Sequence, residues 1–161
     1  MQPLTAPIAA PARWQWSAFD DLDVHALDAI YRARQLVFAL EQDCVYLDVD
    51  GHDAHAFHIA AWPASGDLPL AYARVLAPGR KYAEASIGRV LTTESARGTG
   101  LGRELVRRAI ASCQQVFPGH GIRISAQTRL ERFYAGFGFE PVGAPYDEDG
   151  ISHTEMLRPF G

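Results

Sequence analysis

The strongest constraint on the fold is the stretch 87–117, in which a strand leads through a glycine-rich turn into a helix. Residues 87–92 are mostly apolar or β-branched, which is typical of a strand. Apolar residues in 101–117 recur with the period of an amphipathic helix. The first turn of a helix carries unpaired N–H groups, and glycines before it let an anion approach them closely. The stretch therefore predicts a phosphate-binding turn.

The spacing within this turn excludes two common phosphate motifs. The turn lacks the Gly-Lys-Ser/Thr sequence that closes a nucleotide-triphosphate loop. It also lacks the third glycine of the dinucleotide motif, because Arg103 stands at that position. What remains is the pattern Arg97-x-x-Gly100-x-Gly102, which taken alone also fits an ordinary strand-to-helix loop.

Composition restricts the class of protein. The chain has 161 residues, 48% of them hydrophobic, which is enough for one domain, and we assign that domain to residues 13–161. The Pro- and Ala-rich residues 1–12 are expected to form a disordered leader. A net charge of −4 argues against nucleic acid as a partner, and no apolar run approaches the ~20 residues of a membrane span. Since the N-terminus does not resemble a signal peptide and the two cysteines are expected to be free thiols, we expect a cytoplasmic protein with no membrane partner.

Hydrophobic patterns predict a sheet interrupted by helices. Residues 14–18 alternate as a first edge strand, and an apolar stripe predicts a helix over 24–41. Three antiparallel strands follow, and after the central helix we expect one more strand, a short helix and a closing strand pair joined by an acidic turn. The expected ranges are 56–62, 68–76 and 86–92 for the three strands, then 122–126, 128–137, 139–144 and 153–158.

Charged residues interrupt apolar positions in the predicted helix and in two strands. Arg34 and Glu41 fall on the helix stripe, where a charge needs a partner. Either they form buried ion pairs or cap carbonyls, or this helix end opens into a pocket. Arg74 and Arg89 either pair with carboxylates across the sheet or project toward a ligand.

The segment 42–58 is acidic and has neither helical nor strand period, so we expect a functional loop. Its aspartates, among them Asp48 and Asp50, would attract a cationic amine, although a solvated acidic loop fits as well. No metal is expected, because the spacing of the three histidines matches no common metal site; they are His52, His55 and His58.

Two motifs resemble the GNAT superfamily of acyl-CoA N-acyltransferases. The pattern Arg97-x-x-Gly100-x-Gly102 is similar to the Arg/Gln-x-x-Gly-x-Gly/Ala turn that holds the pyrophosphate of coenzyme A in that family. Residues 133–139 resemble the Tyr-x-x-x-Gly-Phe sequence that closes its last helix. By this resemblance Tyr134 protonates the departing thiolate, which a phenol with a reference pKa near 10 can do. The alternative is that Tyr134 is a core aromatic with a satisfied hydroxyl.

From Trp14 to Pro159 the chain resembles the ElaA-like branch of this superfamily, in segments that begin at Arg34, Tyr46 and Ala71 and in the central strand. The first of these segments is also similar to acyl-homoserine-lactone synthases, which share the GNAT fold. The resemblance implies an α/β (α+β) GNAT fold with a mixed, mostly antiparallel sheet of about 6–7 strands, flanked by about 3–4 helices. A bulge would splay the two central strands into a V-shaped cleft.

The resemblance also implies where an acyl-CoA would bind. The pyrophosphate would lie on the turn 97–103, and the pantetheine would add as an extra strand along 90–92, with a backbone N–H near Leu91 polarising the thioester carbonyl. Gln127 stands near the place where many members have an Asn that contacts the coenzyme A arm. The expected cofactor-binding residues are Val90, Leu91, Thr92, Arg97, Gly98, Thr99, Gly100, Leu101, Gly102, Arg103 and Gln127.

The sequence offers several candidates for the general base and for the acceptor site. No acid of the central strand is an obvious base, so the candidates beside Tyr134 are Glu41, His58 and Glu84. We assign to the acceptor site the residues Arg34, Phe38, Asp48, Asp50, Arg74 and Arg89.

We therefore expect an acetyl-CoA-dependent N-acetyltransferase that transfers the acetyl group directly to a primary amine of a small molecule or peptide. Two alternatives remain. One is an acyltransferase like the acyl-homoserine-lactone synthases, and the other is a non-catalytic acyl-CoA-binding sensor, which the lack of an obvious base favours. A homodimer through an edge strand is compatible with the predicted sheet.

Overall fold

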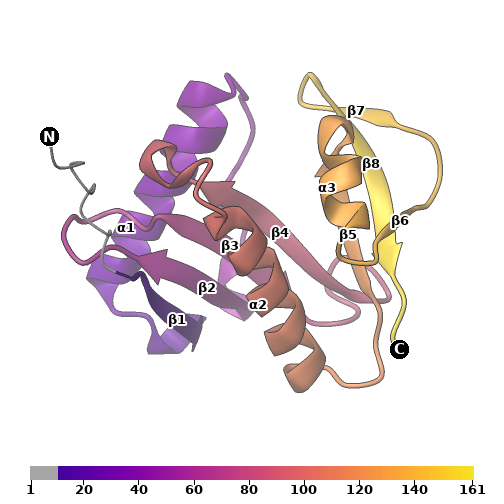
Figure 1. Cartoon of the computed structure of the whole chain (residues 1–161), viewed down its shortest axis with the longest axis horizontal. Coiled ribbons are helices and arrows are strands. Elements are labelled where there is room, and N and C mark those ends of the chain that lie inside the picture. Colours follow the sequence, from indigo (N-terminus) through magenta and orange to yellow (C-terminus); the bar gives the residue numbers. More distant parts are fainter. Residues whose placement is uncertain (1–10) are drawn as a thin grey trace, which may run out of the picture.

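The computed structural model describes residues 11–161, so the predicted leader, 1–12, lies almost entirely outside the described part. One sheet of eight strands forms its centre, in the order β1-β2-β3-β4-β5-β8-β6, with β7 paired to β8 (Figure 1). All pairs are antiparallel except β4 with β5, which confirms the expected mixed sheet. The strands are β1 (Arg13–Ala18), β2 (Ala56–Trp62), β3 (Ala71–Leu76), β4 (Ala85–Thr92), β5 (Ile122–Gln127), β6 (Glu140–Pro141), β7 (Tyr146–Glu148) and β8 (Ile151–Arg158).

The two longest helices, α1 (Val24–Arg34) and α2 (Leu101–Val116), cover opposite faces of the sheet. Ala60 and Trp62 of β2 pack into the core under α1, whereas Ile59 and Ala61 of the same strand pack into the core under α2. This alternation follows from the two-residue period of a strand, and it explains why β2 and β3 are apolar on both faces. The short helix α3 (Glu131–Ala135) contributes to the core on the α2 face.

The predicted helix 24–41 has the expected extent but changes its winding. It begins at Asp23, whose carboxylate accepts a hydrogen bond from Ala26 N at 2.7 Å. From Gln35–Glu41 it continues as a π-helix. Such wide turns are rare and occur often at functional sites. No helix in the described residues is long and apolar enough to cross a membrane.

The C-terminal part differs from the sequence prediction. The predicted strand 139–144 is reduced to β6, because Gly143 at φ 89° and Pro145 interrupt the extended backbone. In its place β7 pairs with β8 through the acidic turn. The predicted helix 128–137 is shorter as well, since one 3₁₀ turn precedes α3.

The middle of β4 carries a bulge. Tyr72 of β3 pairs with Leu91, but Arg74, two residues later, pairs with Gly88, so two residues of β4 face one of β3. The family resemblance implied a bulge in the central strands, and this bulge lies in one of them.

β4 and β5 separate soon after they begin. They pair only at Ala85 with Ile122 and at Ser86 with Arg123. From that point the strands diverge, and Figure 1 shows β4 and β5 in two parts of the molecule that spread away from each other. This confirms the V-shaped splay between the two central strands.

Candidate functional site

The glycine-rich turn presents the N-terminus of α2 at the surface. Gly98 and Gly100 have φ of 75° and 86°, left-handed values that favour glycine. Gly100 precedes α2, and the first helical hydrogen bond runs from Glu104 N to Gly100 O at 3.2 Å. The residues of the turn are exposed, so the free N–H groups of the first helical turn are accessible to an anion.

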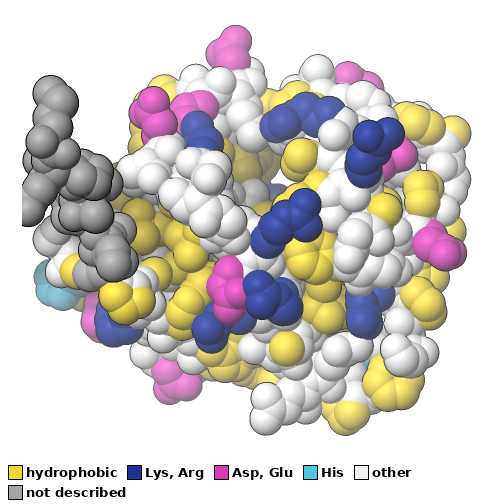
Figure 2. All heavy atoms as spheres, in the orientation of Figure 1, with side chains coloured by type: hydrophobic (Ala, Val, Ile, Leu, Met, Phe, Trp, Pro, Cys, Tyr) yellow, Lys and Arg dark blue, Asp and Glu magenta, His cyan; other side chains and the backbone are white. Residues whose placement is uncertain are grey.

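Two arginines flank this turn. Arg97 Nη2 donates to Glu41 Oε2 at 2.5 Å and to Thr92 O at 2.9 Å. The guanidinium of Arg103 lies 5.6 Å from the ring centroid of Phe133, which connects α2 with α3. Figure 2 shows Lys and Arg side chains (dark blue) along α2 and around the hollow between α2 and α3. Positive charge beside a helix N-terminus suits an anionic ligand.

The open end of the splay provides unpaired strand edges. Among the described residues, β4 has no strand partner on its β5 side beyond Ser86, so the backbone at 90–92 can accept an extended ligand. Gln127 ends β5 and donates from Nε2 to Gln42 Oε1 at 3.2 Å. The expected coenzyme A residues on β4, in the turn and at the end of β5 thus all lie around the open part of the splay.

Tyr134 lies in α3 and is 7% exposed. Its ring packs edge-on against Phe133 and Phe139, with centroids 5.1 and 6.0 Å away. Burial raises the pKa of Tyr134 to about 12. No described residue forms a hydrogen bond with its hydroxyl. A phenol in this state keeps its proton at neutral pH and is free to donate it.

The three candidate bases have different surroundings. His58 is buried, with Nδ1 2.7 Å from the hydroxyl of Tyr72 and Nε2 2.9 Å from the carbonyl oxygen of Asp53, and burial lowers its pKa. Glu84 accepts two hydrogen bonds from Arg123, both 3.0 Å long, just before the closed end of the splay. Glu41 lies beside the glycine-rich turn in its ion pair with Arg97. Of the three, only Glu41 lies near the expected donor site.

Three arginines and three aspartates form a network between α1, the acidic loop and the sheet. Arg34 donates to Asp53 at 2.7 Å and to Asp48 at 2.9 Å. Arg74 donates to both carboxylate oxygens of Asp50, at 2.8 and 3.0 Å, and to Asp53 at 3.2 Å. We call these residues the arginine–aspartate network; its members are Arg34, Arg74, Arg89, Asp48, Asp50 and Asp53.

Arg89 connects this network to the bulge of β4. Its backbone has φ 53°, which is uncommon for a residue other than glycine. Its guanidinium donates to Asp48 at 2.8 Å and to Asp50 at 3.2 Å, and lies 5.2 Å from the ring centroid of Tyr46. These contacts offset the cost of the left-handed backbone, so the acidic loop holds the bulge in place.

The network shows how the buried arginines predicted from the sequence are paired. The side chain of Arg34 is 0% exposed and that of Arg74 is 3% exposed, so the ion-pair interpretation of these arginines is confirmed. Each aspartate of the network faces an arginine, and the charges balance. The expectation that Asp48 and Asp50 attract a cationic amine therefore loses its physical basis. Burial also puts Arg34 and Arg74 out of reach of a diffusing acceptor.

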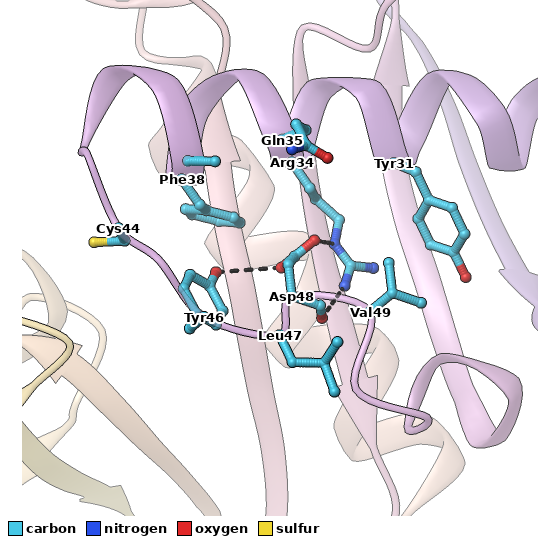
Figure 3. A pocket seen from close by; sticks show the side chains of 10 residues that line it. Tyr31, Arg34, Gln35, Phe38, Cys44, Tyr46, Leu47, Asp48 and Val49 are labelled. Atoms are coloured by element: carbon cyan, nitrogen blue, oxygen red, sulfur yellow. Dashed lines mark hydrogen bonds and ion pairs between the residues drawn. The ribbon is translucent and has the colours of Figure 1, made fainter.

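A cavity of about 250 Å³ lies between the π-helical end of α1 and the acidic loop (Figure 3). Tyr46 reaches across it and donates to Asp48 at 3.2 Å, while Leu47 and Val49 are exposed at its rim. The helix end that carries Phe38 therefore does open into a pocket. Its lining residues are Tyr31, Arg34, Gln35, Phe38, Ala39, Cys44, Tyr46, Leu47, Asp48 and Val49.

A second polar cluster was absent from the sequence prediction. Ser125 on β5 donates to Glu148 at 3.1 Å and is hydrogen-bonded to the hydroxyl of Tyr146. His153 Nε2 lies 3.5 Å from Glu148 Oε2. The acidic turn at 147–150 was visible in the sequence, but the pairing of β7 with β8 that brings these side chains together was not.

No group of three or more His, Cys, Asp or Glu residues within 11–161 is arranged to hold a metal ion.

Comparisons with known proteins agree with this architecture. The family described as "Acetyltransferase (GNAT) domain" matches residues 69–158. A UPF0039 protein of Synechocystis is 42% identical over 89% of this chain and 93% of its own, and protein ElaA of Escherichia coli is 37% identical over 90% and 95%. The crystal structure of an acyl-CoA N-acyltransferase from Pseudomonas aeruginosa, 36% identical, superimposes with a TM-score of 0.86 over 91% of this chain and 99% of that chain.

The chain belongs to the GNAT acetyltransferase family and resembles its ElaA-like members. The acyl-homoserine-lactone synthase BjaI, 15% identical with a TM-score of 0.71 over 91% of this chain and 82% of that chain, shares the fold. Membership in the family makes the chain an acyltransferase by class, with a fold that generally binds acyl-CoA.

The network generates a prediction about stability. Arg34→Met should lower the free energy of unfolding by about 3–5 kcal/mol, because it leaves Asp53 and Asp48 each with one fewer partner inside the protein. Denaturant unfolding measures the change. Arg32→Met, two residues earlier on the same helix with a solvent-exposed ion pair to Asp67, should change stability little. Equal effects of the two substitutions would contradict a structural role for the network.

The network also predicts loss of stability in acid. Burial alone would raise the pKa of Asp50 and of Asp53, but the hydrogen bonds from Arg74 and Arg34 outweigh it and hold both pKa values below the usual range. A lowered folded-state pKa stabilises the protein above the ordinary Asp value of about 3.9, and this contribution is lost as the pH falls through the folded-state pKa. As the pH is lowered, the free energy of unfolding should therefore decrease less steeply in Arg34→Met/Asp53→Asn than in the unaltered protein, because the variant lacks one of these carboxylates. An unchanged slope would exclude the network as its source.

Proposed function

We propose that this protein transfers the acetyl group of acetyl-CoA directly to a primary amine of a small molecule or peptide. The observation that carries the proposal is the exposed N-terminus of α2, which follows two left-handed glycines at the open end of the splay. Backbone N–H groups at such a terminus bind phosphate without any special side chain. Acetyl-CoA provides a reactive thioester, and the role of the protein is to hold this thioester in place beside the amine.

The residues around the splay fit this donor. In the proposed complex the turn 97–103 holds the pyrophosphate, and the unpaired edge of β4 at 90–92 holds the extended arm through backbone hydrogen bonds. Arg97 would exchange its ion pair with Glu41 for phosphate oxygens. Tyr134 would return a proton to the departing thiolate, since its raised pKa keeps the phenol protonated at neutral pH and its hydroxyl has no hydrogen-bond partner among the described residues.

Two other functions use the same scaffold. A synthase like the acyl-homoserine-lactone enzymes would need a longer acyl group and a different amine, and relatives of that kind share only the fold with this chain. A sensor that binds acyl-CoA without turnover would need no base and no proton donor. A homodimer through an edge strand and a cytoplasmic location stay predictions.

The donor site is tested by titrating acetyl-CoA into the protein in a calorimeter. Gly100→Glu should weaken binding by about 100-fold or more, because it places a carboxylate beside the pyrophosphate and a side chain at φ 86°. Gly79→Glu is the matched control, since Gly79 has φ 84° with no neighbour within 4 Å and lies in another turn. Absence of binding to the unaltered protein would refute the donor assignment.

Tyr134→Phe separates an enzyme from a sensor. Turnover of acetyl-CoA with ethylamine should fall by about 100-fold, while the dissociation constant of acetyl-CoA and the melting temperature stay the same, because the ring is kept and only the proton donor is lost. Thiol release measures turnover. If the unaltered protein binds acetyl-CoA without turnover and the substitution changes nothing, the sensor function is correct.

A further inference from the structure

The network and the second polar cluster lie on the same face of the sheet. Arg74 of the network pairs with Gly88 of β4, and Ser86, two residues before Gly88, points to the same face. Ser86 pairs in register with Arg123 of β5, so Arg123 and Ser125 point to that face as well. Since β4 and β5 pair no further than Arg123, Ser125 lies on the open wall of the splay.

Most carboxylates on this face are already neutralised by arginine. Asp48, Asp50 and Asp53 belong to the network. Glu84 and Glu155 both accept hydrogen bonds from Arg123, at 3.0 and 3.1 Å. A carboxylate held by a guanidinium is a poor proton acceptor, because the pair stabilises its charged form.

Glu148 differs from these carboxylates. Its contacts among the described residues are the hydroxyl of Ser125 at 3.1 Å and the ring of His153 at 3.5 Å, with no ion pair to Arg or Lys. Ser125 is hydrogen-bonded in turn to Tyr146. Two hydroxyls and a partly exposed carboxylate therefore converge from β5 and β7 beside the open part of the splay.

The start of the acidic loop closes this region from the other side. Gln42 is hydrogen-bonded to Gln127 at the end of β5, and Cys44 Sγ lies 3.8 Å from the carbonyl oxygen of Asp149, next to Glu148. The loop, β5 and the β7–β8 hairpin thus meet at the open end of the splay. A small molecule bound there would contact all three segments.

We infer that Glu148 binds the ammonium group of the acceptor and is the base that deprotonates it, with the hydroxyls of Ser125 and Tyr146 beside it as further hydrogen-bond partners. The inference rests on the proposed function and narrows the acceptor to a primary amine that arrives as a cation. In the transfer step the ammonium gives one proton to Glu148, the nitrogen bonds to the acetyl carbonyl carbon, and the carbon–sulfur bond breaks. The thiolate takes the proton of Tyr134, the second proton from nitrogen restores Tyr134 through water, and Glu148 releases its proton to solvent.

Several charged or titratable groups face Glu148 and have to be considered in any pH profile. His153 lies on β8, Tyr146 on β7, and Lys81 comes from the loop between β3 and β4. Loss of hydration lowers the pKa of Lys81, and the charge of Glu148 opposes that shift. Arg123 and Glu155 lie nearby but are paired with each other.

The test compares Glu148→Gln with the unaltered protein, using acetyl-CoA and ethylamine. Ethylamine is small enough to reach the carboxylate whatever the rest of the natural acceptor is. At neutral pH, kcat/KM for ethylamine should fall by about 100-fold or more, while acetyl-CoA binding in the calorimeter stays the same. The defect should shrink as the pH approaches the pKa of the amine, because the free amine needs no base. A purely structural role would not produce this rescue.

Asp149→Asn is the matched control, because it removes one negative charge from the same turn at φ 52°, which Asn tolerates. It should leave kcat/KM nearly unchanged. Equal losses in both variants, a loss in Glu148→Gln that high pH does not rescue, or no loss at all would overturn the inference. Two other outcomes would refute the proposed function, on which the inference rests. The first is an unaltered protein that binds acetyl-CoA but does not acetylate ethylamine at high concentration, and the second is an unaltered protein that does not bind acetyl-CoA.

Discussion

The arginine–aspartate network is the interaction on which the rest of the structure depends. It removes guanidinium and carboxylate groups from water at one place, where an unpaired charge would cost several kcal/mol. The end of α1, the strand β3 and the acidic loop therefore have to fold together or not at all. This constraint explains how the loop, with little regular structure of its own, comes to be held against the sheet.

Arg89 connects the network to the bulge of β4, beside the proposed donor site. The left-handed backbone of this residue produces the bulge of β4, and its side chain is held by Asp48 and Asp50. Because β4 carries the bulge and pairs with β5 at only two positions, backbone groups at the edges of both strands have no partner strand within residues 11–161, whereas in a continuous sheet they would pair with each other. An ion-pair network on one face of the sheet thus holds the bulged strand beside the point where β4 and β5 separate.

The two faces of the sheet divide the proposed reaction between them. The glycine-rich turn, α2 and Tyr134 lie on one face, where the proposed acyl-CoA would bind. Ser125 lies on the other face, with Glu148 hydrogen-bonded to it, where the acceptor would arrive. In this arrangement the donor and the acceptor meet through the gap between β4 and β5, and neither has to pass the other. The charge-balanced network beside the gap adds rigidity without attracting either of them.

Features of the site that depend on a few neighbouring residues were determined by the sequence itself. The turn from Gly98 to Gly100, the helix after it and the Tyr134 motif are such features, because glycine geometry and helix N–H groups act over one or two turns. The strands β2 and β3 were predicted from their runs of apolar residues, and the splay was implied by the family resemblance. Only the tertiary structure decided which partners the charges have. Asp53 meets Arg34, and Glu148 meets Ser125, because packing and strand register bring distant segments together. A one-residue shift in strand register would turn Ser125 of β5 or Glu148 of β7 to the other face, and no local signal in the sequence fixes that choice.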